Sequence, residues 1–281
     1  MKRSACSGPP DVTDWGRAAI RVDQAHEALG HRVFETDGAV FICNPALPDI
    51  HVANYARSVR ADAPDAIGRL LKRAEREFSG CPHRCFEVDL DTPPTFEARR
   101  VFEGYEAREF VLMVLEGDLR GKPKGADLGL ARDERAWAAA DRLKRLDWAE
   151  ARAKVGLAPL PKVGDHLALL ARLKTPPDRK WLASIDGEAR GMASAWDGVD
   201  GVAQVEDVFV EPEYRHRGLG TALIHHCVAD GRAHGAEAVV IVADAGDTPQ
   251  TMYAAMGFRP VATKRRYVRY SHSNSCQPED T

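Results

Sequence analysis

Residues 205–223 read VEDVFVEPEYRHRGLGTAL, and the periodicity of this stretch changes twice within nineteen residues. Residues 202–210 are mostly β-branched or aromatic, which favours a strand, and Pro212 interrupts it. From Gly218 the apolar residues recur at helical spacing, which predicts a helix that ends before Gly235. The sequence therefore predicts a strand, a glycine-containing turn and a helix in direct succession.

The turn at residues 215–220 has the composition of an anion site. Glycine lets a backbone approach a ligand closely, and the first turn of a helix has amide hydrogens without intrahelical acceptors. The helix dipole and the side chains of Arg215 and Arg217 add positive charge there. We therefore predict a diphosphate site. It is neither a P-loop, because no Gly-Lys-Ser/Thr follows, nor a complete dinucleotide fingerprint, because the third glycine is absent.

This turn resembles the signature of the Gcn5-related N-acetyltransferase (GNAT) superfamily, Gln/Arg-x-x-Gly-x-Gly/Ala, at Arg215, Gly218 and Gly220. Residues 206–214 are similar to the usual fourth strand of that family, and residues 252–258 to its Leu-Tyr-x-x-x-Gly-Phe motif. The C-terminal half carries these motifs, whereas the N-terminal half matches only by its order of elements. The resemblance implies an α/β (α+β) fold that uses acetyl-coenzyme A as cosubstrate and no metal.

The resemblance also assigns the residues that bind the donor. In the family the fourth and fifth strands splay apart, and freed amides of the fourth strand bind the pantetheine and the acyl carbonyl; here these are Val208 and Val210. The family often has a donor-contacting asparagine seven residues before its tyrosine, where this chain has Gly246. The full set expected to bind the donor is Val208, Phe209, Val210, Arg215, His216, Arg217, Gly218, Leu219, Gly220 and Thr221.

Two residues are candidates for proton transfer. Glu206 matches the glutamate that serves as general base in relatives, and a base is needed because an amine with a pKa near ~10 is protonated at neutral pH. In a regular strand Glu206 and Asp207 point to opposite faces, so we expect only one of them to face the cleft, and the resemblance favours Glu206 over Asp207. Tyr253 matches the family's proton donor to the coenzyme thiolate. The alternatives are a solvent-exposed carboxylate for Glu206 and a core side chain for Tyr253.

The composition fits one large or two modest soluble domains. The chain has 281 residues, a net charge of -3 and 44% hydrophobic residues, which argues against a nucleic-acid-binding surface. No apolar run approaches the ~20 residues of a membrane helix, and the N-terminus lacks the apolar segment of a signal peptide. We expect a cytoplasmic monomer or homodimer with reduced thiols. Cys81, His83 and Cys85 could be interpreted as metal ligands, but no second Cys/His pair lies nearby, so a turn entering a strand is favoured.

The order hairpin, helix, strand, short helix, strand occurs in both halves of the chain, and we interpret it as an internal duplication. Each lobe is expected to form a twisted, mixed, mostly antiparallel sheet flanked by helices. We call the predicted diphosphate site at residues 215–220 the cradle. The corresponding segment of the first copy, residues 59–65, has no glycine and two carboxylates, so the first copy is not expected to bind coenzyme A. The predicted regions are a flexible N-terminus at 1–12, a degenerate GNAT-like domain at 13–118, a linker at 119–131, a catalytic GNAT domain at 132–270 and a disordered tail at 271–281.

The expected function is acetyl transfer from acetyl-coenzyme A to a primary amine of a small molecule, by direct attack. One alternative is a sensor or scaffold that binds acyl-coenzyme A without catalysis. Another is a transferase with a larger acyl or an aminoacyl donor, in which basic side chains would hold a nucleic-acid carrier, although a charged helix face is the commoner explanation. Those side chains are Lys124, Arg142, Lys144, Arg145 and Lys154. The acceptor cannot be identified from the sequence.

Overall fold

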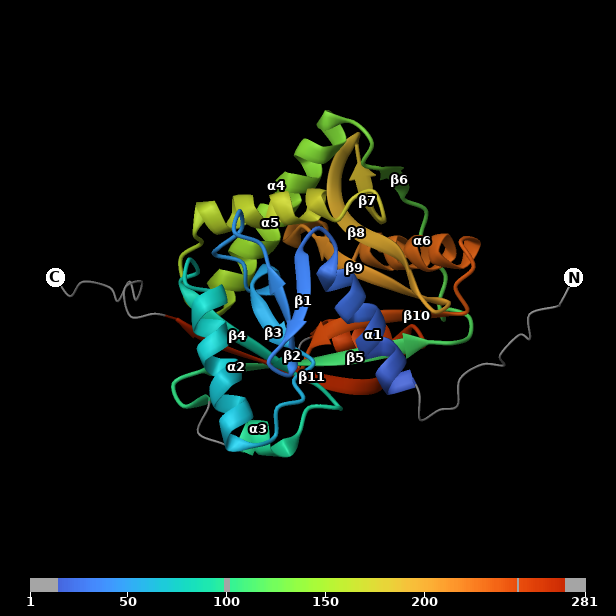
Figure 1. Cartoon of the computed structure of the whole chain (residues 1–281). Coiled ribbons are helices and arrows are strands. Elements are labelled where there is room, and N and C mark those ends of the chain that lie inside the picture. Colours follow the sequence, from blue (N-terminus) through green and yellow to red (C-terminus); the bar gives the residue numbers. More distant parts are fainter. Residues whose placement is uncertain (1–14, 99–101, 247, 271–281) are drawn as a thin grey trace, which may run out of the picture.

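The computed structural model describes residues 15–98, 102–246 and 248–270, whose strands form one sheet (Figure 1). The strand order is β1-β2-β3-β4-β11-β5-β10-β9-β8-β7-β6. Within these ranges the pairs β3–β4 and β9–β10 are parallel and the others antiparallel. The predicted α/β class with a mixed, mostly antiparallel sheet is therefore confirmed. The predicted flexible N-terminus (1–12) and disordered tail (271–281) lie outside the described residues.

The first half of the chain supplies one end of the sheet and one strand near its middle. The predicted hairpin forms with Asp37 and Gly38 in its turn, both at positive φ (49° and 75°). The elements are α1 (Trp15–Ala28), β1 (Arg32–Thr36), β2 (Ala39–Cys43), η2 (His51–Ala53), β3 (Tyr55–Arg57), α2 (Pro64–Glu77), β4 (His83–Val88), α3 (Pro94–Ala98) and β5 (Glu106–Leu115).

The second half begins with a strand inside the segment predicted to be a linker, 119–131. Leu128 and Leu130 of this strand, β6, are half-buried and pair antiparallel with β7, although the surrounding residues are rich in glycine and lysine. The elements are β6 (Asp127–Leu130), α4 (Glu134–Lys154), α5 (Pro161–Leu173), β7 (Asp178–Ile185), β8 (Glu188–Val199), β9 (Val202–Val210), η4 (Pro212–Tyr214), α6 (Leu219–Ala233), β10 (Ala238–Asp244), α7 (Thr248–Ala255) and β11 (Arg259–Tyr270).

The two halves exchange their last strands. β5, the last strand of the first half, lies between β10 and β11 and pairs antiparallel with both. β11, the last strand of the second half, lies between β4 and β5. Each half thus places its last strand beside the parallel pair of the other half. The predicted boundaries at 118 and 132 divide the chain but not the sheet, because the two lobes share one continuous set of hydrogen bonds.

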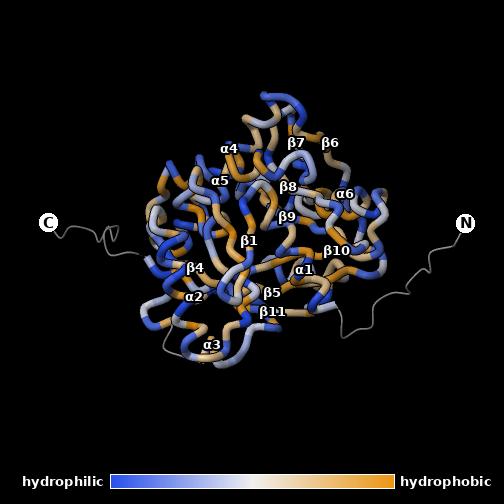
Figure 2. Tube along the Cα trace, in the orientation of Figure 1, coloured by the Kyte–Doolittle hydropathy of each residue, from blue (hydrophilic) through white to orange (hydrophobic). Residues whose placement is uncertain are grey.

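Helix α1 belongs to the first half but packs on strands β5, β8, β9, β10 and β11. It covers one face of the sheet, where Val22 lies in a core cluster with Leu112 and Val240. Helix α6 covers the opposite face, where Leu223 packs with Ile241. Residues 238–243 of β10 are continuously apolar, which suits a strand that is covered on both faces, and the tube is hydrophobic along β10 in Figure 2. None of the helices within the described ranges combines the length and apolarity needed to cross a bilayer.

Candidate active site

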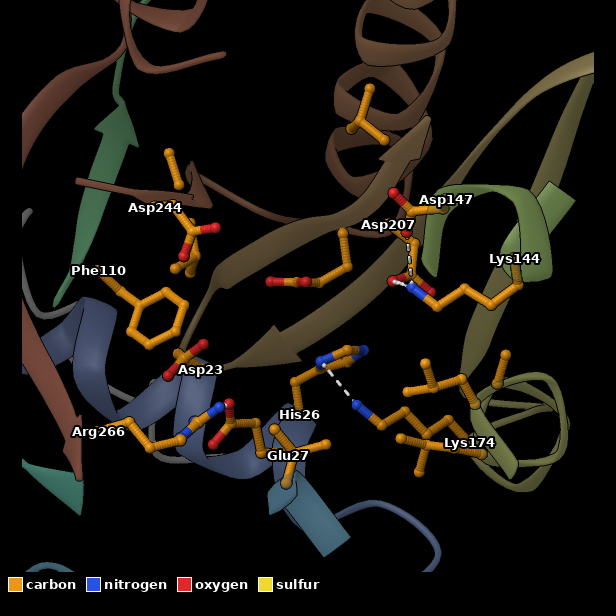
Figure 3. Close-up of a pocket in the computed structure, with 18 of the residues that line it drawn as sticks. Asp23, His26, Glu27, Phe110, Lys144, Asp147, Lys174, Asp207, Asp244 and Arg266 are labelled. Atoms are coloured by element: carbon orange, nitrogen blue, oxygen red, sulfur yellow. Dashed lines mark hydrogen bonds and ion pairs between the residues drawn. The ribbon is translucent and has the colours of Figure 1, made fainter. Parts of the chain in front are cut away.

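Strands β9 and β10 begin as a parallel pair and then separate. Their ladder runs from the Val202–Ala238 pair to the Val205–Ile241 pair, whereas β9 continues to Val210 and β10 to Asp244. Beyond Val205 the two strands therefore have no ladder with each other. A cavity of about 430 Å³ adjoins this separation and is lined by side chains from α1, α4, α5, β5, β9, β10 and β11 (Figure 3). Both halves of the chain thus contribute to one cavity.

A β-bulge in β9 brings two neighbouring carboxylates to this cavity. Ser194 of β8 pairs with Glu206 and Met192 pairs with Phe209, so Asp207 and Val208 together lie opposite one residue. Asp207 adopts a left-handed φ of 53°. Glu206 and Asp207 both line the cavity. The expectation that only one of them faces the cleft is wrong, because it assumed the alternation of a regular strand.

Asp207 is held by two lysines. One carboxylate oxygen accepts a hydrogen bond from Lys144 of α4 at 2.8 Å, and the other accepts one from Lys180 of β7 at 2.6 Å. Burial by itself raises the pKa of Asp207, but the two ammonium groups outweigh it and hold that pKa well below its usual value. With both oxygens engaged by cations, Asp207 fastens α4 to the sheet and is poorly suited to remove a proton.

Glu206 has a different environment. Its Oε1 accepts a hydrogen bond of 2.6 Å from the side-chain amide of Gln204. The same amide donates to Asp23 of α1 at 3.3 Å. No lysine, arginine or histidine of the described residues lies within ion-pair distance of Glu206. Glu206 is therefore the carboxylate of this cavity that is held by a neutral donor and is available to a cationic or proton-donating ligand.

A buried network of charges closes one side of the cavity. The ammonium group of Lys264 bonds to Asp23 and lies 3.2 Å from Glu27 and 3.1 Å from Glu87, while Arg266 also pairs with Glu27 and Glu87. Burial raises the pKa of Asp23 to about 6, because the attraction of Lys264 does not offset it and the nearby carboxylates add to it. This network joins α1, β4 and β11, and hence both halves.

The carboxylates of Asp23, Glu27 and Glu87 are close enough together to hold a metal ion. Lys264 already places its ammonium group among these three carboxylates, so a cation of the protein itself balances them. Among the described residues, Cys81, His83 and Cys85 do not form such a group. The Nε2 of His83 instead pairs with the backbone oxygen of Asn54 at 3.1 Å.

The predicted cradle forms a tight turn at the start of α6. His216 and Gly218 both adopt left-handed conformations, with φ values of 60° and 91°. Gly218 is the N-cap and provides no side-chain cap, and the amide of Ala222 makes the first bond back to its carbonyl at 2.9 Å. The amides of residues 219–221 therefore precede the first intrahelical bond. This arrangement suits an anion at the helix N-terminus.

The cations around the cradle differ from the sequence-based expectation. The guanidinium group of Arg215 forms an ion pair with Glu150 of α4, so its charge is largely compensated within the protein. Arg217 is exposed. Lys124 is not among the residues expected to bind acetyl-coenzyme A, yet its side-chain carbon atoms lie 3.2–3.3 Å from the position that a Cβ on Gly218 would occupy. Lys124 therefore lies directly against the cradle.

The remaining predicted donor-site residues and Tyr253 lie in different environments. Val208 lines the cavity. Phe209 packs with Met192 on the α4 side of the sheet, whereas Val210 packs on the α6 side. Tyr253 of α7 is 5% exposed, lies in the α6-side core with its ring centroid 6.1 Å from that of Phe258, and is not part of the cavity wall.

The basic side chains that could hold a nucleic-acid carrier mostly have carboxylate partners in the protein. The pairs are Arg142–Glu211, Lys144–Asp207, Arg145–Asp165 and Lys154–Glu150. These four cations do not form a free basic face, so the structure gives no support to a nucleic-acid-linked donor.

The contribution of α1 to the cavity was not among the sequence-based expectations. Asp23, His26 and Glu27 all line the cavity, and their spacing of three and four residues places them on one helix face. Charged and polar residues at this spacing, between the apolar residues of the same helix, are the sequence feature that could have indicated a site. Lys174, just after α5, was also missed; it lines the cavity and its side chain points toward His26 (Figure 3).

Comparison with known proteins finds a family domain in the second half of the chain and a shared fold over most of its length. The model of the acetyltransferase (GNAT) family matches residues 140–258, which include β9, the cradle and Tyr253. No curated protein has a sequence that matches the chain significantly.

Several solved structures share the fold over most of the chain. A functionally unknown conserved protein from Staphylococcus epidermidis has a TM-score of 0.66 and 13% identity, with 86% of this chain and 94% of that chain covered. A GCN5-related N-acetyltransferase from Kribbella flavida has a TM-score of 0.64 and 19% identity, with coverages of 91% and 96%. A tandem GNAT protein from the clavulanic acid biosynthesis pathway has a TM-score of 0.54 and 17% identity, with coverages of 77% and 75%. At these identities the structures show a shared fold alone. Residues 140–258 therefore form a domain of the acetyltransferase (GNAT) family, within a chain that shares its overall fold with these structures.

Proposed function

We propose that this chain transfers an acetyl group from acetyl-coenzyme A to a primary amine of a small molecule, with Glu206 as the general base. The observation that carries the proposal is the position of Glu206. It lines the cavity where β9 and β10 separate and has a neutral partner, Gln204, in place of a cation. The family supplies acetyl transfer in general; the amine acceptor and the donor are our proposal.

Donor binding is assigned to the cradle and to β9. The amides at the start of α6 and the exposed Arg217 suit the diphosphate of the donor. The separation of β9 from β10 leaves Val208 beside the cavity, where its backbone amide suits the acetyl carbonyl oxygen. In this arrangement the acetyl group reaches the same cavity as Glu206.

In the proposed reaction, Glu206 accepts a proton from the acceptor's ammonium group, directly or through water. The free amine nitrogen then attacks the thioester carbonyl, so that an N–C bond forms and the C–S bond breaks. The departing thiolate takes a proton from Tyr253, and the second proton of the attacking nitrogen returns through solvent to the resulting phenolate, while Glu206 releases its proton to water. The role of Tyr253 requires that the thiol reach the buried phenol of α7 between the separating strands.

The first half of the chain is assigned a supporting role. Its helix α1 forms one wall of the acceptor cavity, and its own region equivalent to the cradle, residues 59–65, has no glycine. We propose that this half is a degenerate copy that shapes the acceptor site. The free thiols Cys43, Cys81, Cys85 and Cys227 suit a reducing compartment, and we propose a cytoplasmic location with a monomeric or homodimeric protein.

The test combines acetyl-coenzyme A binding with turnover on a panel of primary amines. Glu206→Gln is expected to lower kcat about 10²–10⁴-fold, the usual contribution of a general base, and to leave the Kd for acetyl-coenzyme A unchanged. Tyr253→Phe is expected to lower kcat as well. Glu35→Gln, on the exposed edge strand β1, serves as the matched control and should behave as the wild type.

Three outcomes would contradict the proposal. Binding of acetyl-coenzyme A without transfer to any amine would indicate a sensor or scaffold. Faster turnover with longer acyl thioesters than with the acetyl thioester would keep the transferase and replace the donor. Wild-type turnover in both Glu206→Gln and Tyr253→Phe would remove the assigned catalytic roles.

A further inference from the structure

The charged groups that line the cavity are nearly all paired with one another. Among the cations, Lys144 pairs with Asp147 and Asp207, while Lys264 and Arg266 pair with the carboxylates of the buried network. Among the carboxylates, Asp244 has Arg108 at 3.8 Å. Of the charged groups on the cavity wall, Lys174 and Glu206 are left without an oppositely charged partner within ion-pair distance in the described part of the chain.

Lys174 is a buried cation with a neutral contact. The residue is 8% exposed, and its ammonium group lies 3.3 Å from the Nδ1 of His26. Because an ammonium group only donates hydrogen bonds, the Nδ1 of His26 is the acceptor and its Nε2 carries the proton. That Nε2 lies 3.6 Å from the buried carboxylate of Asp178. His26 therefore positions Lys174. The carboxylate of Asp178 lies on the far side of the imidazole ring and does not contact the Lys174 ammonium group directly.

A buried ammonium group without a direct counterion stabilises an anion that enters beside it. Glu206, the carboxylate of the cavity wall without a cationic partner, is suited to a protonated amine. We infer that the acceptor is an amino carboxylate, whose carboxylate binds Lys174 while its amine faces Glu206. This inference rests on the proposed function and adds the substrate class.

The chemistry favours a carboxylate over a dianion such as a phosphate monoester. One lysine supplies one positive charge, and the other cations of the wall are already engaged by carboxylates. A single carboxylate balances Lys174, whereas a second negative charge would lie unpaired near Glu206, Asp207 and Asp244. The cavity, at about 430 Å³, is within the range of small-molecule sites.

The test uses pairs of acceptors that differ only in charge. Each α- or ω-amino acid, from glycine to 6-aminohexanoate, is compared with its carboxamide by measuring kcat/KM for coenzyme A release. The wild type is expected to prefer the best amino acid over its amide by about 10–100-fold, the value of a charge-assisted hydrogen bond. In Lys174→Met this ratio should fall toward one, mainly through KM, and Lys174→Arg should retain most of it.

Lys162→Met is the matched control. Lys162 is on α5, the helix that Lys174 directly follows, but its side chain is 70% exposed, pairs with Asp49 at 3.0 Å and lies outside the cavity wall. This variant should keep the wild-type ratio. Equal kcat/KM for amino acids and amides in the wild type, or an unchanged ratio in Lys174→Met, would overturn the inference and leave amine acetylation intact.

A binding measurement separates this inference from the proposed function. The N-acetyl derivative of each amino acid is titrated into the wild type and into Lys174→Met by calorimetry. The inference is supported, even if no thioester is consumed, when the N-acetyl amino acid binds the wild type, its carboxamide does not, and Lys174→Met binds neither. Absence of carboxylate-dependent binding across the series overturns it.

Discussion

The side-chain amide of Gln204 donates to the carboxylate of Glu206 at 2.6 Å and to that of Asp23 at 3.3 Å. Gln204 is 1% exposed, so its amide is enclosed between the proposed base on β9 and a carboxylate of α1. One neutral donor thus connects the catalytic strand to the helix contributed by the other half of the chain.

Replacing Gln204 with methionine should therefore impair catalysis. The change keeps a side chain of similar length but removes the donor that orients Glu206, and kcat should fall about tenfold, the equivalent of ~1.4 kcal/mol. The KM for acetyl-coenzyme A should not change, because the cradle is untouched. Gln24→Met is the matched control, since Gln24 is on α1 next to Asp23 but its side-chain amide bonds to Asp89 at 3.0 Å. Unaltered kcat in Gln204→Met would show that Glu206 does not depend on this bond.

Asp207→Asn should destabilise the protein more than it changes the chemistry. The carboxylate neutralises Lys144 and Lys180, and Lys180 is 1% exposed, so a neutral amide leaves a buried cation unpaired. The free energy of unfolding should fall by about 3 kcal/mol, as for other broken buried pairs. Asp165→Asn is the control, because Asp165 pairs with Arg145 at the surface, where the two side chains are 60% and 48% exposed. The free energy of unfolding of this variant should change by less than ~1 kcal/mol. Urea denaturation of both variants decides the matter, and equal stabilities would contradict a structural role for Asp207.

The sequence was sufficient to predict the strand, turn and helix at 202–233, because each depends on short-range features. β-Branched residues favour β9, and Gly218 permits the left-handed turn that begins α6. The uninterrupted apolar run at residues 238–243 is typical of a strand that is covered on both faces, as β10 is. These local features were enough to establish the fold class.

The arrangement of the cavity depends on contacts that no local pattern encodes. The bulge at Asp207 depends on the pairing with β8 and on lysines that lie 63 and 27 residues away in sequence. The exchange of β5 and β11 pairs two strands that are far apart in the sequence. The pattern of a single strand does not specify which other strand it pairs with. The role of α1 follows from that exchange, which is why Asp23 and His26 were not expected in the site.

The buried histidine His83 should make stability depend on pH. Burial lowers the pKa of His83 from 6.5 to about 4; its bond to the Asn54 carbonyl opposes this, and the charge of Arg84 adds to it. The Nδ1 of this ring is buried without a partner, so protonation would introduce an unsatisfied donor. As pH falls, the histidine of the unfolded chain binds its proton first. The stabilisation that neutral His83 gives the folded state is therefore complete above pH ~6.5 and is lost between pH 6.5 and 4, by up to about 3 kcal/mol.

His83→Gln should therefore flatten the dependence of unfolding free energy on pH in this window, since glutamine can still donate to Asn54 but does not titrate. Some slope should remain, because burial also lowers the pKa of His31 to about 4 and of His51 to about 3. His234→Gln, at a side chain that is 47% exposed, is the control and should leave the slope as in the wild type. Denaturation curves from pH 4 to 7.5 provide the measurement, and an identical slope in His83→Gln would refute this assignment.

The contact between Lys124 and Gly218 predicts a third cation at the cradle. The side-chain carbons of Lys124 lie 3.2–3.3 Å from where a Cβ on Gly218 would be, so its ammonium group can reach a diphosphate bound at the helix N-terminus. Lys124→Ala should weaken acetyl-coenzyme A binding about 3–10-fold and reduce its dependence on salt, since one screened charge contact is lost. Lys122→Ala, two residues away on the same exposed segment, should retain wild-type affinity. If calorimetry at low and high salt gives the two variants equal affinities, Lys124 only covers Gly218 in the free protein and takes no part in holding the donor.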